Sequence, residues 1–295
     1  MDSEVTANSS IAAALAPGTG AGDVEPGLHA PVVGVFDSGI GGFTVARAVL
    51  ELRPDLGLVY FGDTLNMPYG GRSLAQLSRM ARNNIEFLLS QSIDILAVGC
   101  NASNSVLGQG ELKSFGVPVF DLVSSTTEFL RGIDDPPGRI ALVATQAAVQ
   151  SGYWERKLKE ALPGVEVVAR AAPDFVPLIE AHVQDDAANR AAVWRVFEPF
   201  AANGIRHIVH GCTHYPLLES YMLEVNPEFE MVDPAKCLAR KLTACLAPAL
   251  PGARQGDLKL FSSLPGEAFY RTAQRVFQCE VRQLTKMYIV NPYEE

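Results

Sequence analysis

The sequence predicts an α/β protein made of two pseudo-symmetric domains, each with a mainly parallel sheet flanked by helices. From residue 31 onward, short aliphatic segments alternate with longer amphipathic ones, which is typical of β-α-β units. The same order of segments then occurs a second time along the chain. One aliphatic segment in each half ends in a Gly-Cys pair, at Cys100 and Cys212. Ligands of open α/β sheets bind beyond the carboxyl ends of the strands, so we expect the active site in the interdomain cleft.

The elements of the first half follow from its apolar spacing. Runs of β-branched and aliphatic residues predict strands at residues 32–36, 58–61, 93–98 and 117–122. Apolar residues at helical spacing predict helices at residues 43–52 and 74–90.

The second half repeats this order. Strands are predicted at residues 140–143, 165–168 and 205–210, with a helix over roughly residues 176–202. Beyond residue 233, the patterns predict a helix at 237–246, a strand at 258–261 and a helix at 268–277. We expect this last segment to fold back onto the first half. The predicted domains are therefore residues 31–123 with 234–295, and residues 124–233.

Residues 1–30 differ from the rest of the chain in composition. They are rich in Ala, Gly, Ser and Pro and contain almost no bulky apolar residues, which predicts a disordered tail. Asp2 and Glu4 stand where a signal peptide would carry positive charge. No apolar stretch approaches the roughly 18 residues that a membrane span needs. We therefore expect a cytoplasmic protein that does not enter a membrane.

Composition narrows the class of partner. Of the 295 residues, 48% are hydrophobic and 19% are charged, as in a globular protein. The net charge is −9 and there is no lysine or arginine run, which argues against binding nucleic acid or an anionic membrane. The five cysteines include no Cys-x-x-Cys pair, so we expect reduced thiols.

Cys100 and Cys212 are the strongest candidates for chemistry. A free cysteine often only fills a core, but two at equivalent strand ends favour a proton donor and a proton acceptor of the same kind. His214 can hydrogen-bond a group in the cleft and stabilise charge. A Cys–His nucleophile is an alternative. A zinc site is disfavoured, because Cys212-x-His214 with one distant thiol lacks the usual ligand spacing.

The turn at residues 37–42 consists almost wholly of small residues. It does not match the dinucleotide fingerprint, because Thr44 stands where the third glycine should be. Its backbone N–H groups and the Ser38 hydroxyl could hold a carboxylate or ammonium group. Asp37 could bind an ammonium group or act on Cys100. A simple helix cap predicts the same serine and glycines.

Two further segments contribute candidate residues. Thr145 ends the first strand of the second half, at the position that Ser38 has in the first half. Residues 63–71 form a turn-rich loop in which Pro68, Tyr69 and Gly70 could form a wall of the pocket.

Taken together, residues 36–42, 63–70, 100–101 and 211–218 resemble the motifs of the cofactor-independent aspartate/glutamate racemase family, and of its glutamate racemases in particular. The motifs occur in the family's order, and the last of them is highly specific. Residues 175–180 also resemble the family segment that carries an acidic residue, here Glu180.

The resemblance implies a reaction without pyridoxal phosphate or metal. Glutamate would lie with its α-carbon between Cys100 and Cys212; one thiolate removes the α-proton and the opposite thiol returns a proton to the other face. By family precedent, Cys100 deprotonates D-glutamate and Cys212 deprotonates L-glutamate. Asp37 and His214 would assist the two cysteines. The product, D-glutamate, would supply peptidoglycan synthesis and so cell-wall biogenesis and cell shape.

The resemblance also implies substrate contacts and partners. The expected contacts are Asp37, Ser38, Pro68, Tyr69, Gly70, Asn101, Ala102, Thr145, Glu180, Thr213 and His214. Members of the family commonly form homodimers, and a cell-wall precursor is a candidate activator.

The chain departs from the family pattern at two places. Ala102 stands where the family has a threonine whose hydroxyl contacts the substrate, and Ser103 or Ser105 could compensate. A hydrogen bond to a charged group contributes roughly 1.5–3 kcal/mol, so the loss bears on substrate choice. A second threonine after Thr145 is replaced by Ala147 or Ala148. Alternatives are therefore a racemase of aspartate or another amino acid, a Cys–His hydrolase or lyase, and a catalytically silent binding protein.

Overall fold

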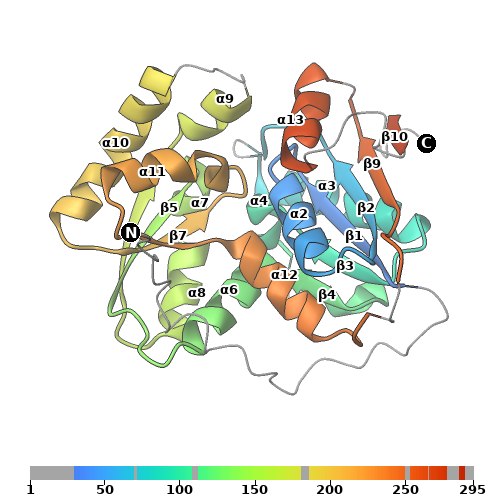
Figure 1. Cartoon of the computed structure of the whole chain (residues 1–295), viewed down its shortest axis with the longest axis horizontal. Coiled ribbons are helices and arrows are strands. Elements are labelled where there is room, and N and C mark those ends of the chain that lie inside the picture. Colours follow the sequence, from blue (N-terminus) through green and yellow to red (C-terminus); the bar gives the residue numbers. More distant parts are fainter. Residues whose placement is uncertain are drawn as a thin grey trace, which may run out of the picture.

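The molecule is built around two parallel sheets that lie side by side (Figure 1). The computed structural model describes residues 30–69, 72–107, 112–180, 186–249, 253–264, 266–277 and 286–289. The predicted tail at residues 1–30 lies outside the described residues except for Ala30, and so does Gly70.

The first sheet has six strands in the order β10-β9-β2-β1-β3-β4, and every pair in it is parallel. Its strands are β1 (Val32–Asp37), β2 (Gly57–Gly62), β3 (Ile95–Val98), β4 (Val119–Asp121), β9 (Leu258–Ser262) and β10 (Lys286–Ile289). Strand β9 pairs with β2, so the segment after residue 233 folds back onto the first half as predicted.

The second sheet has four parallel strands in the order β6-β5-β7-β8. They are β5 (Arg139–Ala144), β6 (Glu166–Ala171), β7 (His207–Gly211) and β8 (Glu230–Val232). This is the order β2-β1-β3-β4 repeated with new strands. The duplication predicted from the sequence is confirmed, and β3 and β7 occupy equivalent places.

Helices cover both faces of each sheet because each strand is apolar on both sides. On the first sheet, α2 (Phe43–Leu52), α12 (Pro234–Ala244) and α13 (Glu267–Phe277) cover one face, and α3 (Leu74–Ser90) covers the other. On the second, one face packs against α9 (Phe175–Glu180), α10 (Asp186–Ala202) and α11 (Glu219–Val225). The opposite face packs against α6 (Leu122–Arg131) and α8 (Tyr153–Ala161). The remaining short helices are α4 (Asn101–Asn104), η2 (Lys113–Phe115), α7 (Gln146–Ser151) and η3 (Tyr215–Leu218).

Two predictions about the second half need correction. The single helix expected over residues 176–202 is wrong, since α9 ends at Glu180 and α10 begins at Asp186. Strand β8 was not predicted, because its two apolar residues, Met231 and Val232, stand between Glu230 and Asp233 and form no longer aliphatic run. The predicted domain boundaries remain a prediction.

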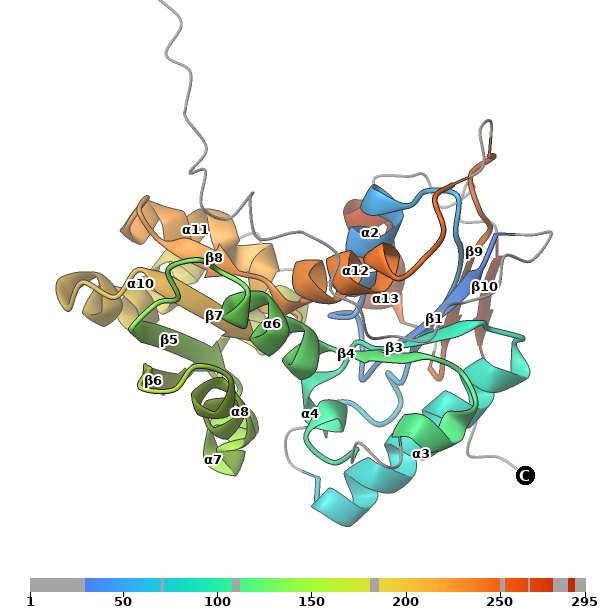
Figure 2. The same cartoon turned by 90° about the horizontal axis from the view of Figure 1, so that it is seen from below.

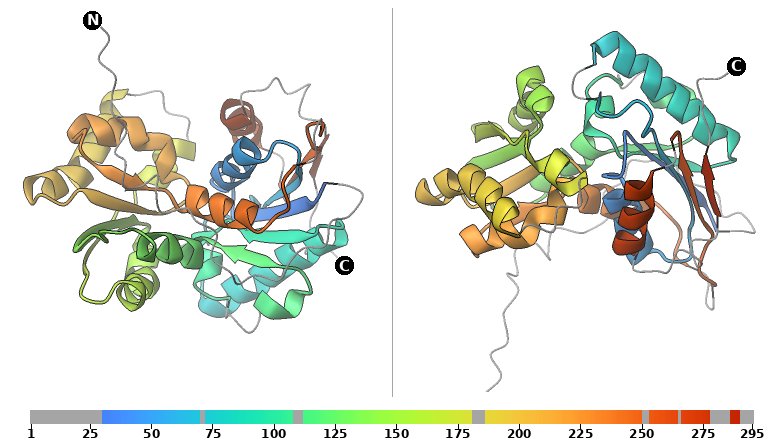
Figure 3. Two further views of the ribbon diagram at one scale, coloured as in Figure 1. Left: turned by 60° about the horizontal axis from the view of Figure 1, so that its bottom comes forward. Right: turned by 90° about the horizontal axis from the view of Figure 1, so that it is seen from above.

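Helix α12 connects the two halves. It packs against α2 of the first half and α6 of the second, and Figures 2 and 3 show it between the two sheets. Lys241 on α12 forms an ion pair with Glu128 on α6 at 2.8 Å. The chain thus crosses between the halves at β4–α6 and again at β8–α12.

The buried side chain of Asn104 holds the end of β3 in place. Its Nδ2 donates to the carbonyl oxygens of Val98 and Cys100, at 3.2 and 2.8 Å. Its Oδ1 accepts from the backbone N–H of Leu122 at 2.9 Å, at the start of α6. The Asn104 amide therefore bonds backbone groups at the end of β3 and at the start of α6, where the chain passes from the first half to the second.

We expect Asn104→Ala to lower the free energy of unfolding by about 2–4 kcal/mol, since the buried Leu122 N–H loses its side-chain acceptor and the Val98 carbonyl loses a side-chain donor. Urea denaturation measures the change. Asn203→Ala is the matched control, because the exposed Asn203 side chain bonds only the Pro199 carbonyl of its own helix. Equal destabilisation by both variants would contradict this role for Asn104.

Candidate active site

The two cysteines lie at equivalent strand ends in the two sheets. Cys100 follows β3 and Cys212 follows β7. Both side chains are buried, with 3% and 7% of their surface exposed. This confirms the prediction that the two Gly-Cys pairs lie at equivalent strand ends.

Two hydrogen bonds join the halves next to these thiols. The Thr213 hydroxyl donates to Asp37 Oδ2 at 3.2 Å, and the Thr44 hydroxyl donates to the Thr213 carbonyl at 3.2 Å. Thr213 comes directly after Cys212, whereas Asp37 ends β1 and Thr44 lies on α2. Residues that follow β7 therefore contact residues at the end of β1 and on α2.

The turn after β1, residues 38–42, packs closely against residues of the second half. Its Asp37 Oδ1 accepts the Gly39 N–H at 2.8 Å, and the Tyr60 hydroxyl donates to the Gly39 carbonyl at 2.7 Å. A Cβ on Gly41 would lie 2.3 Å from His214 Nδ1 and 2.5 Å from Thr213 Oγ1. Only glycine fits at position 41 with these two side chains in place.

Cys212, His214 and Glu180 form a hydrogen-bonded chain. Cys212 Sγ lies 3.7 Å from His214 Nδ1, and His214 Nε2 lies 2.8 Å from Glu180 Oε1. Burial lowers the pKa of the imidazole, but the hydrogen bonds to Cys212 and Glu180 outweigh it and raise the pKa of His214 to about 10. His214 is therefore an imidazolium at neutral pH, and its Nδ1 lies within hydrogen-bond reach of the Cys212 sulfur.

Cys100 has the opposite surroundings. Burial raises the pKa of its thiol to about 11, and the nearby charge of Asp37 adds to the rise, which groups on Ser103 and Ser38 oppose. Burial also raises the pKa of the Asp37 carboxyl, against the effects of His214, Gly39 and Thr213. Cys100 is therefore a thiol at neutral pH.

Asn101 makes another contact between the halves. The indole Nε1–H of Trp154, on α8, donates to Asn101 Oδ1 at 3.0 Å. Asn101 Nδ2 is buried and has no hydrogen-bond partner among the described residues. Trp154 was missed in the sequence, because a contact between two domains leaves no local pattern.

Compensation for Ala102 by Ser103 or Ser105 stays a prediction. The Ser105 hydroxyl donates to the Ala102 carbonyl at 2.7 Å, inside its own turn. Ser103 is wholly buried beside the Cys100 thiol, and its hydroxyl oxygen has no hydrogen-bond partner among the described residues.

Other predicted residues have structural partners. The Tyr69 hydroxyl is buried; it donates to Asp63 Oδ2 at 2.6 Å and accepts from Asn84 Nδ2 at 2.9 Å. Pro68 beside it is exposed. The Thr145 hydroxyl caps α7 by accepting the Ala148 N–H at 3.3 Å. Substrate contact by these residues stays a prediction.

Comparison with known proteins places the chain in a family. Residues 44–242 match the Asp/Glu/Hydantoin racemase family. A glutamate racemase of Desulforudis audaxviator is 35% identical over 267 residues, which cover 86% of this chain and 97% of that protein. The chain belongs to the Asp/Glu/Hydantoin racemase family.

Solved structures agree with this assignment. A glutamate racemase of Thermus thermophilus, in complex with β-chloro-D-alanine, matches with a TM-score of 0.74 and 31% identity over 88% of this chain and 96% of that chain. An Escherichia coli glutamate racemase, solved with L-glutamate and the activator UDP-MurNAc-ala, shares the fold at 24% identity and a TM-score of 0.69, over 88% of this chain and 98% of that one. The protein is thus an amino-acid racemase, an isomerase.

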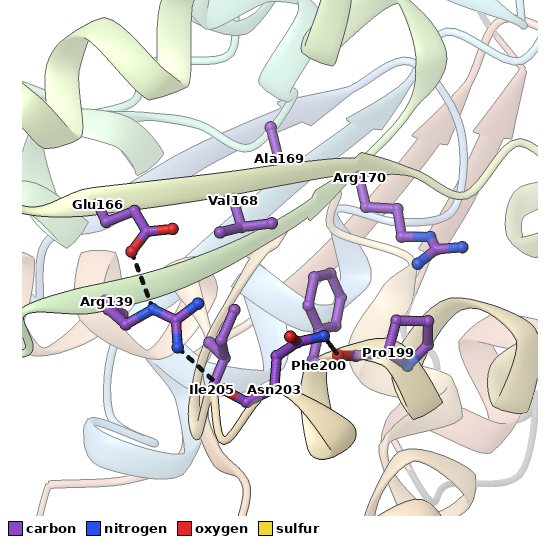
Figure 4. Close-up of a pocket in the computed structure, with 9 residues that line it drawn as sticks. All are labelled: Arg139, Glu166, Val168, Ala169, Arg170, Pro199, Phe200, Asn203 and Ile205. Atoms are coloured by element: carbon purple, nitrogen blue, oxygen red, sulfur yellow. Dashed lines mark hydrogen bonds and ion pairs between the residues drawn. The ribbon is translucent and has the colours of Figure 1, made fainter.

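A separate pocket of about 470 Å³ lies beside β6, the edge strand of this racemase's second sheet. It is lined by β6 and the end of α10, including Arg170 and Phe200, and Arg139 bonds to Glu166 at 2.9 Å within it (Figure 4). It lies away from the strand ends that carry the two cysteines.

Two absences hold for the described part of the racemase. No group of three or more His, Cys, Asp or Glu side chains there is arranged to hold a metal ion. None of the described helices is long and apolar enough to cross a bilayer.

We expect Gly41→Ala to lower racemase turnover at least about 100-fold, because the added methyl group displaces His214 and Thr213, and small misplacements of catalytic groups are costly. Turnover is measured by polarimetry. Gly138→Ala is the control, since its new methyl group would meet nothing within 4 Å. Full activity of Gly41→Ala would contradict the close contact.

Proposed function

We propose that this racemase interconverts L- and D-glutamate by a two-base proton transfer between Cys212 and Cys100. The observation that supports it best is the unequal pair of thiols at equivalent strand ends, one beside an imidazolium and one beside a buried carboxyl. A racemase needs one base and one acid on opposite faces of the α-carbon. The relatives named above as glutamate racemases favour glutamate as the substrate.

Cys212 is the proposed base towards L-glutamate. His214 Nδ1 lies 3.7 Å from its sulfur, and Glu180 holds the imidazole ring through Nε2. In the proposal, the thiolate removes the α-proton of L-glutamate, and Cys212 becomes a thiol.

Cys100 is the acid in that direction. Its raised pKa keeps it protonated until the α-carbon develops negative charge, when it gives its proton to the opposite face. Cys100 then carries the thiolate and Cys212 the thiol, which is the state that accepts D-glutamate. Because both thiols are buried, bulk water does not compete for these protons.

The carboxylates of glutamate need fixed hydrogen-bond donors. The buried Nδ2 of Asn101 has no partner among the described residues and is one such donor. A donor in this position would bind the substrate carboxylate in the ground state and in the transition state alike.

We further propose a cytoplasmic enzyme that supplies D-glutamate for peptidoglycan. Cys100, Cys212, Cys237 and Cys245 are free thiols, which suits a reducing compartment. The activator bound to the E. coli relative supports a cell-wall precursor as a candidate activator here. A homodimer stays a prediction.

We expect wild-type protein in D₂O to invert either enantiomer of glutamate with incorporation of α-deuterium, because the proton returned comes from an exchangeable thiol. Cys100→Ala and Cys212→Ala should each abolish inversion. Circular dichroism and α-proton NMR measure the two processes. Cys245→Ala, which changes a cysteine at the end of α12, serves as the control and should stay active.

Each other outcome has a definite meaning. Turnover of aspartate but not glutamate would replace the substrate. A covalent adduct at one cysteine without inversion would indicate a hydrolase or lyase. Tight glutamate binding without deuterium uptake would indicate a silent binding protein.

We expect Glu180→Gln to move the alkaline limit of activity down by about 1–2 pH units. The limit reflects loss of the His214 proton, whose pKa is about 10 with the carboxylate in place. Without that carboxylate the imidazolium is less stabilised, so its pKa falls and deprotonation comes at lower pH. The pH dependence of turnover and the NMR titration of His214 measure the change.

Glu230→Gln is the matched control for this experiment. Glu230 pairs with His207 at 3.2 Å on the same sheet but away from the cysteines. Its removal should leave the alkaline limit where it is. An unchanged limit in Glu180→Gln as well would show that Glu180 does not act through His214.

A further inference from the structure

We infer that Trp154 is a positioning residue: its indole N–H orients the Asn101 amide so that Asn101 Nδ2 can donate to a carboxylate of the substrate. The inference rests on the proposed function and adds a residue to it. Trp154 Nε1 lies 3.0 Å from Asn101 Oδ1, and Asn101 follows Cys100 directly.

The chemistry of the two groups fixes the orientation of the amide. An indole N–H can only donate, whereas an amide presents an acceptor oxygen and a donor nitrogen. The Trp154 N–H therefore requires Oδ1 on its side and places Nδ2 on the other. Asn101 Nδ2 is buried there without a partner among the described residues, and a buried donor of this kind calls for a ligand.

Trp154 is well suited to hold the amide still. Only 2% of its surface is exposed, and its ring belongs to the core between α6, α8 and the second sheet, with Leu130, Leu142 and Leu158. Packing of this density leaves the ring one rotamer. The donor is thus fixed by one half of the molecule and the amide by the other, so the orientation is set when the halves are together.

The substitution at position 102 makes this orientation more important. Ala102 carries no hydroxyl, and the Ser105 hydroxyl is bonded to the Ala102 carbonyl. Asn101, the first residue of α4, then presents a side-chain donor directly after Cys100. If the Asn101 amide could rotate freely, its oxygen would face the substrate carboxylate about half the time, and the two oxygens would repel each other.

The test compares Trp154→Phe with Trp194→Phe in the full chain. These are the only two tryptophans of the sequence, and Trp194 on α10 is 53% exposed. We expect Trp154→Phe to raise KM for glutamate about tenfold with kcat changed less than about threefold, as for one substrate hydrogen bond. Trp194→Phe should change neither.

A double-mutant cycle separates positioning from general damage. If Trp154 acts through Asn101, Trp154→Phe should raise KM less than about twofold in an Asn101→Ala background. The same tenfold rise in both backgrounds would overturn the inference, because it would mean that Trp154 acts independently of Asn101.

A second variant covers the case in which Trp154→Phe does not fold. Incorporation of β-(3-benzothienyl)alanine into the Trp194→Phe chain replaces only the indole N–H at position 154 by sulfur and keeps the ring. We expect the same tenfold rise in KM. A normal KM would overturn the inference while leaving the proposed function intact, whereas absence of glutamate turnover in the wild type would overturn the proposed function itself.

Discussion

The hydrogen bond from Thr213 to Asp37 crosses from one half of the molecule to the other, and the other groups of the candidate site depend on that approach. It requires a bare backbone at Gly41, against which Thr213 and His214 rest. With the halves held at this distance, Asp37 acts electrostatically on His214 across the boundary, as it does on Cys100 within its own sheet. Were the halves farther apart, each cysteine would have only the neighbours that its own sheet provides.

Burial acts on the two sides of the site in different ways. At Cys100 it is the dominant influence, and it keeps the group neutral because a thiolate loses its hydration there. At His214 it also favours the neutral form, yet hydrogen bonds to a sulfur and a carboxylate reverse the result. The duplicated fold thus supplies two similar strand ends, and each thiol has different charged neighbours there: Asp37 beside Cys100, and His214 with Glu180 beside Cys212.

Much of the arrangement follows from the sequence, because strands and their carboxyl ends have local patterns. The alternation of segments predicted both sheets, and the positions of Asp37, Cys100 and Cys212 at strand ends follow from it. The pairing of Glu180 with His214 could not be read in that way, since the two lie on different elements. Trp154 reaches Asn101 only through the packing of two halves, and the two apolar residues of β8 stand between acidic ones and form no aliphatic run.

The asymmetry of the pair also bears on how a duplicated fold can serve a reversible reaction. His214 and Glu180 lie beside Cys212, so the two ends of the proposed proton transfer differ. In the proposed mechanism the transfer leads from a first state with a thiol at Cys100 to a second state with a thiolate there. The second state holds a thiolate at Cys100 near the Asp37 carboxyl, which disfavours it. In the proposed reaction, a substrate ammonium group near Asp37 would have the right charge to stabilise that state.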